Sequence, residues 1–188
     1  KDEIHLGQGE SLQDTSAMFS LFLDVLVLRL YEEEKLYEFA RNSKIPIING
    51  LTNESHPCQV IADIFTFQEF RGSISGKKVV WLGVANNVFQ SFLHAAVALN
   101  FQIVFSGPSK FQPGEKMLEF IKNHNSDIFT IEPNPVVAVD SADLVVTDKW
   151  VSMHDNQLPK SDIDDLSVYR VTKKLLGFAR TDVLFMHC

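Results

Sequence analysis

The feature that most constrains this chain is a regular alternation of short apolar runs with amphipathic segments along its 188 residues. The apolar runs are rich in β-branched residues, whereas the segments between them have the period of a helix. Such alternation predicts a parallel sheet with helices on both of its faces. We expect strands at residues 25–30, 45–49, 78–83, 102–107, 127–132, 143–148 and 182–188. We expect helices at 11–22, 32–42, 57–71, 87–99, 114–124, 134–141 and 172–179, with a polar loop between 148 and 172.

The alternation is interrupted by the segment GSISG at residues 72–76. Glycine and serine at this density are typical of a linker, and the strand and helix pattern starts again after it. We therefore expect two domains, with the boundary between residues 72 and 73. The second has the pattern of a nearly complete doubly wound domain, whereas the first resembles the end of another. The chain has no initiator methionine and finishes on the strand-like residues VLFMHC, so we interpret both ends as cut.

The composition argues against several classes of function. A net charge of −7 and 17 scattered basic residues disfavour a nucleic-acid surface, because phosphate contacts need clustered lysines and arginines. Cys58 and Cys188 lie far apart without metal-ligand spacing, so neither a disulfide framework nor a zinc site is indicated. Reduced thiols are typical of a cytosol-like compartment. The longest apolar run contains Asp24 and Arg29 and is too short to span a membrane.

Polar side chains follow five of the expected strands at their carboxyl ends, where open parallel sheets bind their ligands. They are Arg29, the segment NESHPCQ at 53–59, the segment GVANNV at 83–88, the segment DKWVSM at 148–153, and Cys188. Because parallel strands end at the same edge of a sheet, these side chains are candidates for a ligand site.

Taken singly, each has a structural explanation, as a surface charge (Arg29), a helix cap (His56, Asn86, Asn87), a turn residue (Asp148, Ser152) or a buried strand thiol (Cys188). All five lie at the carboxyl ends of expected strands, and this shared position favours a ligand site over separate structural roles. GVANNV also lacks the G-x-G-x-x-G pattern, which disfavours a nicotinamide-dependent dehydrogenase.

In order and spacing, the segments HLGQGESLQDT, INGLTNESHPCQVIADIFTFQE, GVANNV, TDKWVSM, YRVT and FMHC resemble the ornithine carbamoyltransferase family along the whole chain. HPCQ alone is similar to carbamoyltransferases in general. The D-x-x-x-S-M loop at 148–153 and the His-Cys pair at 187–188 resemble the ornithine branch. The resemblance implies an α/β fold of two doubly wound parallel-sheet, Rossmann-like domains, the first only partly present. Residues 1–72 would belong to the carbamoyl-phosphate-binding domain with an interdomain helix, and residues 73–188 to a C-terminally incomplete ornithine-binding domain.

The resemblance implies transfer of the carbamoyl group of carbamoyl phosphate to the side-chain amine of L-ornithine, which gives L-citrulline and phosphate. It implies that Arg29 and His56 stabilise the developing oxyanion and that Gln59 accepts a hydrogen bond from the carbamoyl NH2. It implies binding of the amino acid by Asn87, Asp148, Ser152 and the backbone of Met153, with Cys188 and Asp148 near the reacting amine.

Catalytic roles therefore fall to Arg29, His56 and Cys188. A nearby carboxylate favours the charged form of an amine, so Asp148 is expected to orient the substrate rather than to deprotonate it. The substrate phosphate and solvent both remain candidates for the base.

No metal or organic cofactor is implied. The resemblance also implies a homotrimer without nucleic-acid or membrane partners, working in arginine metabolism in either the biosynthetic or the catabolic direction. The expected compartment is the cytoplasm, and an organellar matrix stays open because an upstream transit segment would lie outside these residues.

Two positions depart from the family pattern. Val84 stands where the family has the acid of G-D-x-N-N, and His154 stands where it has the glycine of S-M-G; both bear on ornithine affinity. The family's S-T-R-T-type phosphate-binding motif is not among these residues, so we expect residues 1–188 alone to be nearly inactive. Two other functions stay open: transfer to another amine such as putrescine, and a non-catalytic relative that only binds.

Overall fold

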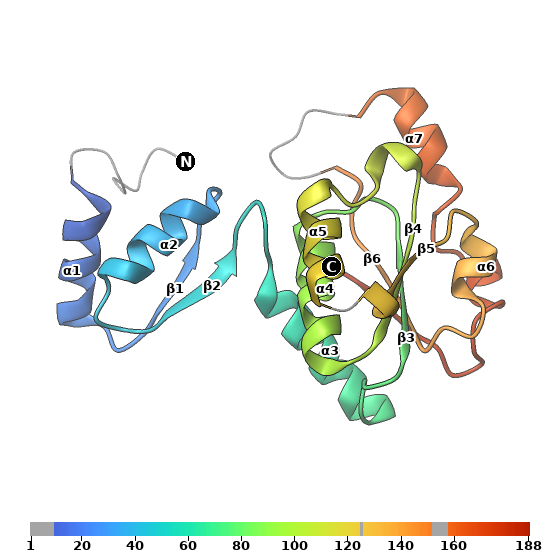
Figure 1. Cartoon of the computed structure of the whole chain (residues 1–188), viewed down its shortest axis with the longest axis horizontal. Helices are drawn as coiled ribbons and strands as arrows, with labels where there is room; N and C mark the ends of the chain where they lie inside the picture. The colour runs from blue at the N-terminus through green and yellow to red at the C-terminus, as the bar shows by residue number, and fades with distance from the viewer. Residues whose placement is uncertain (1–9, 125, 152–157) are drawn as a thin grey trace. The chain divides into compact units, whose positions relative to one another are not determined.

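The computed structural model describes residues 10–124, 126–151 and 158–188 (Figure 1). The chain divides into two compact units, Lys1–Cys58 and Gln59–Cys188. Both units are α/β, and every described strand pairing is parallel. The fold class predicted from the alternation is therefore confirmed.

The first unit packs two helices against a parallel strand pair. Its elements are α1 (Leu12–Phe22), β1 (Leu26–Arg29), α2 (Glu33–Asn42) and β2 (Ile47–Leu51). Leu28 of β1 packs with Leu36 and Phe39 of α2 in a small core. The buried Ser16 hydroxyl donates to the Phe39 carbonyl oxygen at 3.0 Å, which ties α1 to α2.

The second unit is built on a five-stranded parallel sheet with the order β5-β4-β3-β6-β7. The strands are β3 (Lys78–Leu82), β4 (Gln102–Ser106), β5 (Phe129–Ile131), β6 (Leu144–Thr147) and β7 (Leu184–His187). The chain builds outward from β3 to one edge and then returns to β6 on the other side. In such sheets ligands bind where the strand order reverses, outside the carboxyl ends of β3 and β6.

Helices cover both faces of this sheet (Figure 1). Val79 and Trp81 of β3 pack toward three helices, α3 (Pro57–Arg71), α4 (Asn87–Leu99) and α5 (Glu115–His124). Val80 and Leu82 pack toward α6 (Pro135–Val139) and α8 (Lys173–Leu176). These four side chains have 0% exposure. β3 is buried on both faces, as its uninterrupted apolar sequence predicts.

The expected helices and strands are all present, although β5, α6 and α8 are shorter than their sequence patterns. The segment 72–76 follows α3 and leads into β3, and Gly72 has a positive φ of 76° that ends the helix. The division into units falls between Cys58 and Gln59, because Val60 and Phe67 of α3 are buried in the core of the second unit. A functional boundary between residues 72 and 73 stays a prediction.

The prediction of a polar loop between residues 148 and 172 is wrong for one stretch. Residues Lys160–Ser167 form a helix, α7. Half of the residues of this helix are charged, and its buried residues are Asp162 and Leu166, so it lacks an apolar stripe. The Asp162 carboxylate pairs with Lys110, at 2.5 Å between Nζ and Oδ2, in the short helix η1 (Ser109–Phe111). Because Lys110 and Asp162 are 52 positions apart, the local hydrophobic pattern of the sequence does not indicate this contact.

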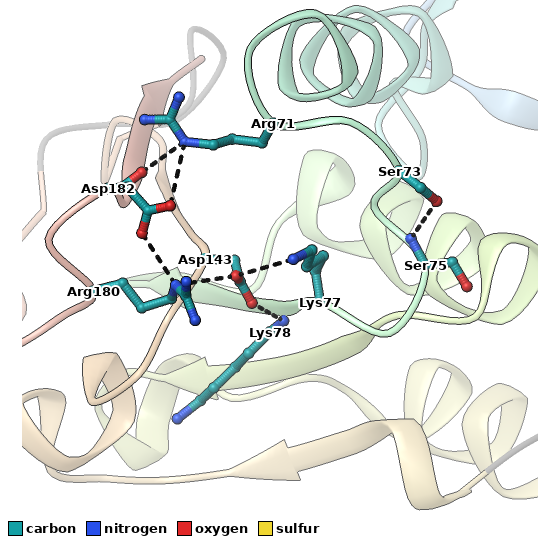
Figure 2. Close-up of polar contacts among 8 residues, drawn as sticks. All are labelled: Arg71, Ser73, Ser75, Lys77, Lys78, Asp143, Arg180 and Asp182. Carbon is teal, nitrogen blue, oxygen red and sulfur yellow. Dashed lines mark hydrogen bonds and ion pairs between the residues drawn. The ribbon is translucent and has the colours of Figure 1, made fainter.

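Charged side chains gather at the amino edge of the sheet (Figure 2). Asp143, at the start of β6, accepts from the Lys78 backbone N–H at 2.9 Å. Its other oxygen lies 3.6 Å from Lys77 Nζ and 3.4 Å from Arg180 Nε. Arg71, at the end of α3, donates to the Asp182 carbonyl oxygen at 2.8 Å. Asp143 thus joins β3 to β6 at the edge opposite the candidate site.

We predict that Asp143→Ala destabilises the protein by about 1–3 kcal/mol, because it leaves the partly buried Lys78 backbone N–H without its acceptor and removes an anionic partner from Lys77 and Arg180. Urea unfolding of the full-length protein measures this loss. The matched control is Asp164→Ala, since Asp164 is exposed on α7. An equal effect of both substitutions would contradict the structural role of Asp143.

Candidate functional site

Hydrogen-bonded polar groups of the second unit lie at the carboxyl edge of its sheet. The strand register pairs Leu82 with Ser106 and with Thr147, and Thr147 with His187. The residues that follow these strands therefore leave the sheet at the same level. Thr147 strengthens this edge, because its buried hydroxyl donates to the Leu82 carbonyl oxygen at 2.7 Å.

Asn86 joins the loops after β3 and β6. Its Oδ1 accepts from the backbone N–H groups of Val88 and Phe89, each at 3.1 Å, and so caps α4. Its Nδ2 donates to Asp148 Oδ2 at 2.7 Å. The helix-cap explanation for Asn86 is confirmed, and the bridge to Asp148 adds a role that sequence reasoning missed. The signal was the adjacent asparagine pair, of which only Asn87 was assigned to the site.

Asn87 follows Asn86 in the chain, and Asp148 is the acceptor of the bridge. Both side chains are half-buried. Asn87 is the first residue of α4, and its carbonyl oxygen accepts from the Ser91 hydroxyl at 3.0 Å. The other Asp148 oxygen, Oδ1, accepts from the Lys149 backbone N–H at 2.7 Å. A carboxylate held on both oxygens is an oriented acceptor, suited to an ammonium group.

The loop that contains Val84 is held through its backbone. The Trp81 indole Nε1 donates to the Val84 carbonyl oxygen at 2.9 Å, and Ala85 N–H donates to the Phe111 carbonyl oxygen at 2.9 Å. Gly107 lies close against the same loop, since a Cβ built there would be 2.0 Å from the Gly83 carbonyl oxygen. Neither backbone anchor requires an acidic side chain at position 84.

Cys188 lies at the same edge, where its backbone N–H donates to the Thr147 carbonyl oxygen at 3.2 Å. Its thiol is exposed in the described chain. The predicted site residues Ser152 and Met153, together with His154, lie outside the described residues. The structure therefore brings Asn87, Asp148 and Cys188 to one edge of the second unit.

In the first unit, a turn after β2 is held by a set of partly buried polar bonds. Thr52 has 0% exposure, and its Oγ1 accepts from Ser55 N–H at 2.9 Å. The Asn49 side-chain amide donates to Ser55 Oγ at 2.8 Å, and Ser55 in turn donates to Glu33 of α2. This turn leads directly into His56, which is half-buried. Sequence reasoning missed Glu33, because its link to the turn spans 22 positions.

Arg29 is the last residue of β1, and it is exposed. No hydrogen bond or ion pair joins its side chain to another residue in the described part of the chain. A regular strand pairing ends there, because the register of β1 on β2 shifts between Leu28 and Arg29. Its guanidinium is therefore accessible to an anion.

Gln59 lies in the first turn of α3 and is held by a carboxyl group on the same helix. Its Nε2 donates to Asp63 Oδ1 at 2.9 Å. Asp63 is 8% exposed, and burial raises its pKa to about 6, against a smaller lowering by the Gln59 hydrogen bond. Sequence reasoning did not single out Asp63, which reads there as one polar residue of an amphipathic helix.

Within the described ranges, no three His, Cys, Asp or Glu side chains gather in a way that would hold a metal ion. No helix among them has the length and apolar character needed to cross a membrane.

Two family models match the chain in succession. Residues 1–69 match the carbamoyl-P binding domain of aspartate/ornithine carbamoyltransferase, and residues 75–188 match the Asp/Orn binding domain of the same family. The ornithine carbamoyltransferase of Ruegeria pomeroyi is 47% identical over 188 residues, which are 100% of this chain and 61% of that protein. That of Paracoccus denitrificans is 46% identical over 99% of this chain and 60% of its own length.

Solved structures agree with these matches. The ornithine carbamoyltransferase from Burkholderia thailandensis has a TM-score of 0.87 and 36% identity, over 100% of this chain and 60% of that one. The enzyme from Pyrococcus furiosus has a TM-score of 0.90 and 33% identity, over 99% of this chain and 60% of that one. The chain thus spans about 60% of the length of the relatives that it matches.

We predict that Gly107→Ala destabilises the second unit by about 1–3 kcal/mol, as overpacking does, because the new Cβ meets a backbone oxygen that cannot turn aside. Thermal unfolding of the full-length protein measures the effect. Gly114→Ala is the matched control, since a Cβ there meets nothing within 4 Å. An unchanged unfolding temperature in Gly107→Ala would show that the two loops separate freely.

Proposed function

The chain belongs to the aspartate/ornithine carbamoyltransferase family, and on this premise we propose that the full-length protein is an ornithine carbamoyltransferase. It would transfer the carbamoyl group of carbamoyl phosphate to the δ-amine of L-ornithine, giving L-citrulline and phosphate. The observation that carries the proposal is the bridged pair Asn86 and Asp148 at the strand-order reversal, in the residues that match the Asp/Orn binding domain. The ornithine carbamoyltransferases that resemble the chain by sequence favour ornithine over aspartate.

The carbamoyl end of the reaction is assigned to the residues around the start of α3 and to Arg29. Attack on the carbamoyl carbon places negative charge on its oxygen, and fixed donors stabilise that charge most effectively where water is excluded. Arg29 and His56 supply such donors in our proposal. Gln59 accepts from the carbamoyl NH2 and sets the orientation of the planar group. The held turn before His56 supports this assignment, because it fixes the backbone from which the imidazole extends.

The amino-acid end is assigned to Asn87, Asp148, Ser152 and the backbone of Met153, which would bind the α-amino and α-carboxylate groups. The accessible thiol of Cys188 is proposed to lie near the reacting amine. That amine has a pKa of about 10 in water, like lysine, and must lose its proton before it attacks. Asp148 would hold the charged form of an amine, so it is assigned to orientation and not to deprotonation.

The departure at position 84 is compatible with ornithine binding in this proposal. The Asn86 loop is anchored by the backbone contacts of Val84 and Ala85. Loss of the family's acid therefore removes one side chain without removing the supports of the loop. This favours a catalytic protein over the non-catalytic alternative.

We extend the proposal to a homotrimer that works in the cytoplasm in arginine metabolism. The family resemblance supports this extension.

We predict that His56→Ala in the full-length protein lowers kcat for citrulline formation by roughly 100-fold or more, the usual cost of removing one donor from a developing oxyanion. Colorimetric citrulline measurement after mixing carbamoyl phosphate with L-ornithine tests this. His124→Ala, which alters an exposed histidine on α5, should leave the rate unchanged. A folded wild-type protein that makes no citrulline would contradict the proposed reaction and favour the binding-only alternative.

We predict that L-ornithine exceeds putrescine in kcat/KM by a factor on the order of 10⁴, because a site built to bind polar groups strongly rejects an analogue that lacks them. Asp148→Ala should reduce this ratio, since it removes the proposed partner of the α-amino group. Asn86→Ala breaks the same bridge but keeps the carboxylate, so it should reduce the ratio less. Comparable rates with both amines in the wild type would favour a different acceptor.

A further inference from the structure

Asp63 is a buried carboxyl group that the proposed reaction does not use directly. It lies one helical turn after Gln59 on the face of α3 that also buries Val60, Ile64 and Phe67. Its Oδ1 accepts from Gln59 Nε2 at 2.9 Å. Its Oδ2 is buried and meets no hydrogen-bond donor among the described residues.

This placement is costly for the stability of the protein. A carboxyl group that is 8% exposed loses its hydration. One hydrogen bond from a neutral amide offsets only part of the free-energy cost of this loss. The pKa of Asp63 is raised to about 6 mainly by this burial, and no cation offsets it. An apolar residue would fill the same position on α3 without the penalty, so packing alone gives no reason for an acid.

The hydrogen bond fixes which end of the Gln59 amide faces outward. The oxygen and nitrogen of a glutamine amide differ as acceptor and donor, and the two orientations are related by a simple flip. An acceptor on Asp63 draws Nε2 toward the helix, and no described residue donates to Oε1. The orientation survives protonation, because a proton on Oδ2 leaves Oδ1 an acceptor.

We infer that Asp63 is a positioning residue: by binding Nε2 of Gln59, it selects the amide orientation in which Oε1 can accept from the NH2 of a carbamoyl substrate. The inference rests on the proposed function, because it takes Gln59 as a contact of the carbamoyl group. Without Asp63 the amide of Gln59 would populate both orientations. In the flipped orientation, Nε2 of Gln59 would face the NH2 of the substrate, and both groups are hydrogen-bond donors.

The test is a double-mutant cycle in the full-length protein with Asp63→Leu, Gln59→Ala and the double variant. Asp63→Leu should lower kcat/KM for carbamoyl phosphate by roughly tenfold or more, as misplacing a group that orients a substrate does, while the unfolding temperature does not fall. In the Gln59→Ala background, the same substitution should have no further effect. A purely structural residue would give equal losses in both backgrounds.

Two further variants complete the design. Asp63→Asn keeps an oxygen that can accept from Nε2, so it should restore most of the activity that Asp63→Leu loses. Asp63→Ala removes the acceptor without adding bulk, and it replaces the leucine variant in the cycle if that variant does not fold. Glu69→Gln neutralises an exposed acid on the same helix and should change nothing.

The outcomes separate the two claims. Losses that add in the cycle, or a folded Asp63→Leu protein with full activity, would overturn the role of Asp63 while the proposed function stands. A folded wild-type protein without citrulline formation would overturn the proposed function and this inference with it. A loss that is confined to proteins with Gln59 supports both.

Discussion

The second unit depends on the double burial of its central strand, β3. Its apolar side chains pack into cores on both faces of the sheet, and its backbone pairs with β4 on one side and β6 on the other. This arrangement leaves the chain no room for variation in register, because a slip by one residue would exchange the two faces. The positions of Gly83 and Asp148 follow from it, since each is the first residue beyond a strand whose end is fixed. The candidate site is therefore a consequence of how β3 is packed.

Local sequence predicted most of this architecture, because strand and helix periodicity are properties of short segments. It did not predict α7, which is stabilised by the ion pair between Asp162 and Lys110, nor the role of Glu33 in the turn before His56. Both depend on partners that become neighbours only in the folded chain. The sequence also indicated which strand ends carry polar residues, but it could not tell which of them would touch. The bond between Asn86 and Asp148 is the clearest case, because its two members come from loops on different strands.

The two units fix their polar groups by different means. In the first unit, hydroxyl groups and a side-chain amide form a connected, partly buried set around Thr52 and Ser55, so that polar bonds hold the turn. In the second unit, backbone groups hold the loop after β3 against the indole of Trp81 and the carbonyl of Phe111. The first arrangement tolerates few changes, because removing one member leaves a buried partner unsatisfied. The second tolerates changes of side chain, and valine at position 84 is such a change.

A carboxylate accepts a hydrogen bond from a side-chain amide at two positions, Asn86 and Gln59. Asn86 is fixed twice, because its oxygen caps α4 and its nitrogen binds Asp148. Flipping its amide would break all of these bonds. Gln59 is fixed once among the described residues, by Asp63 alone. Removing Asp148 should therefore leave the Asn86 amide oriented by the helix, whereas removing Asp63 leaves nothing in the described chain to distinguish the two ends of Gln59. The buried acid on α3 is the more sensitive position, although it touches no substrate.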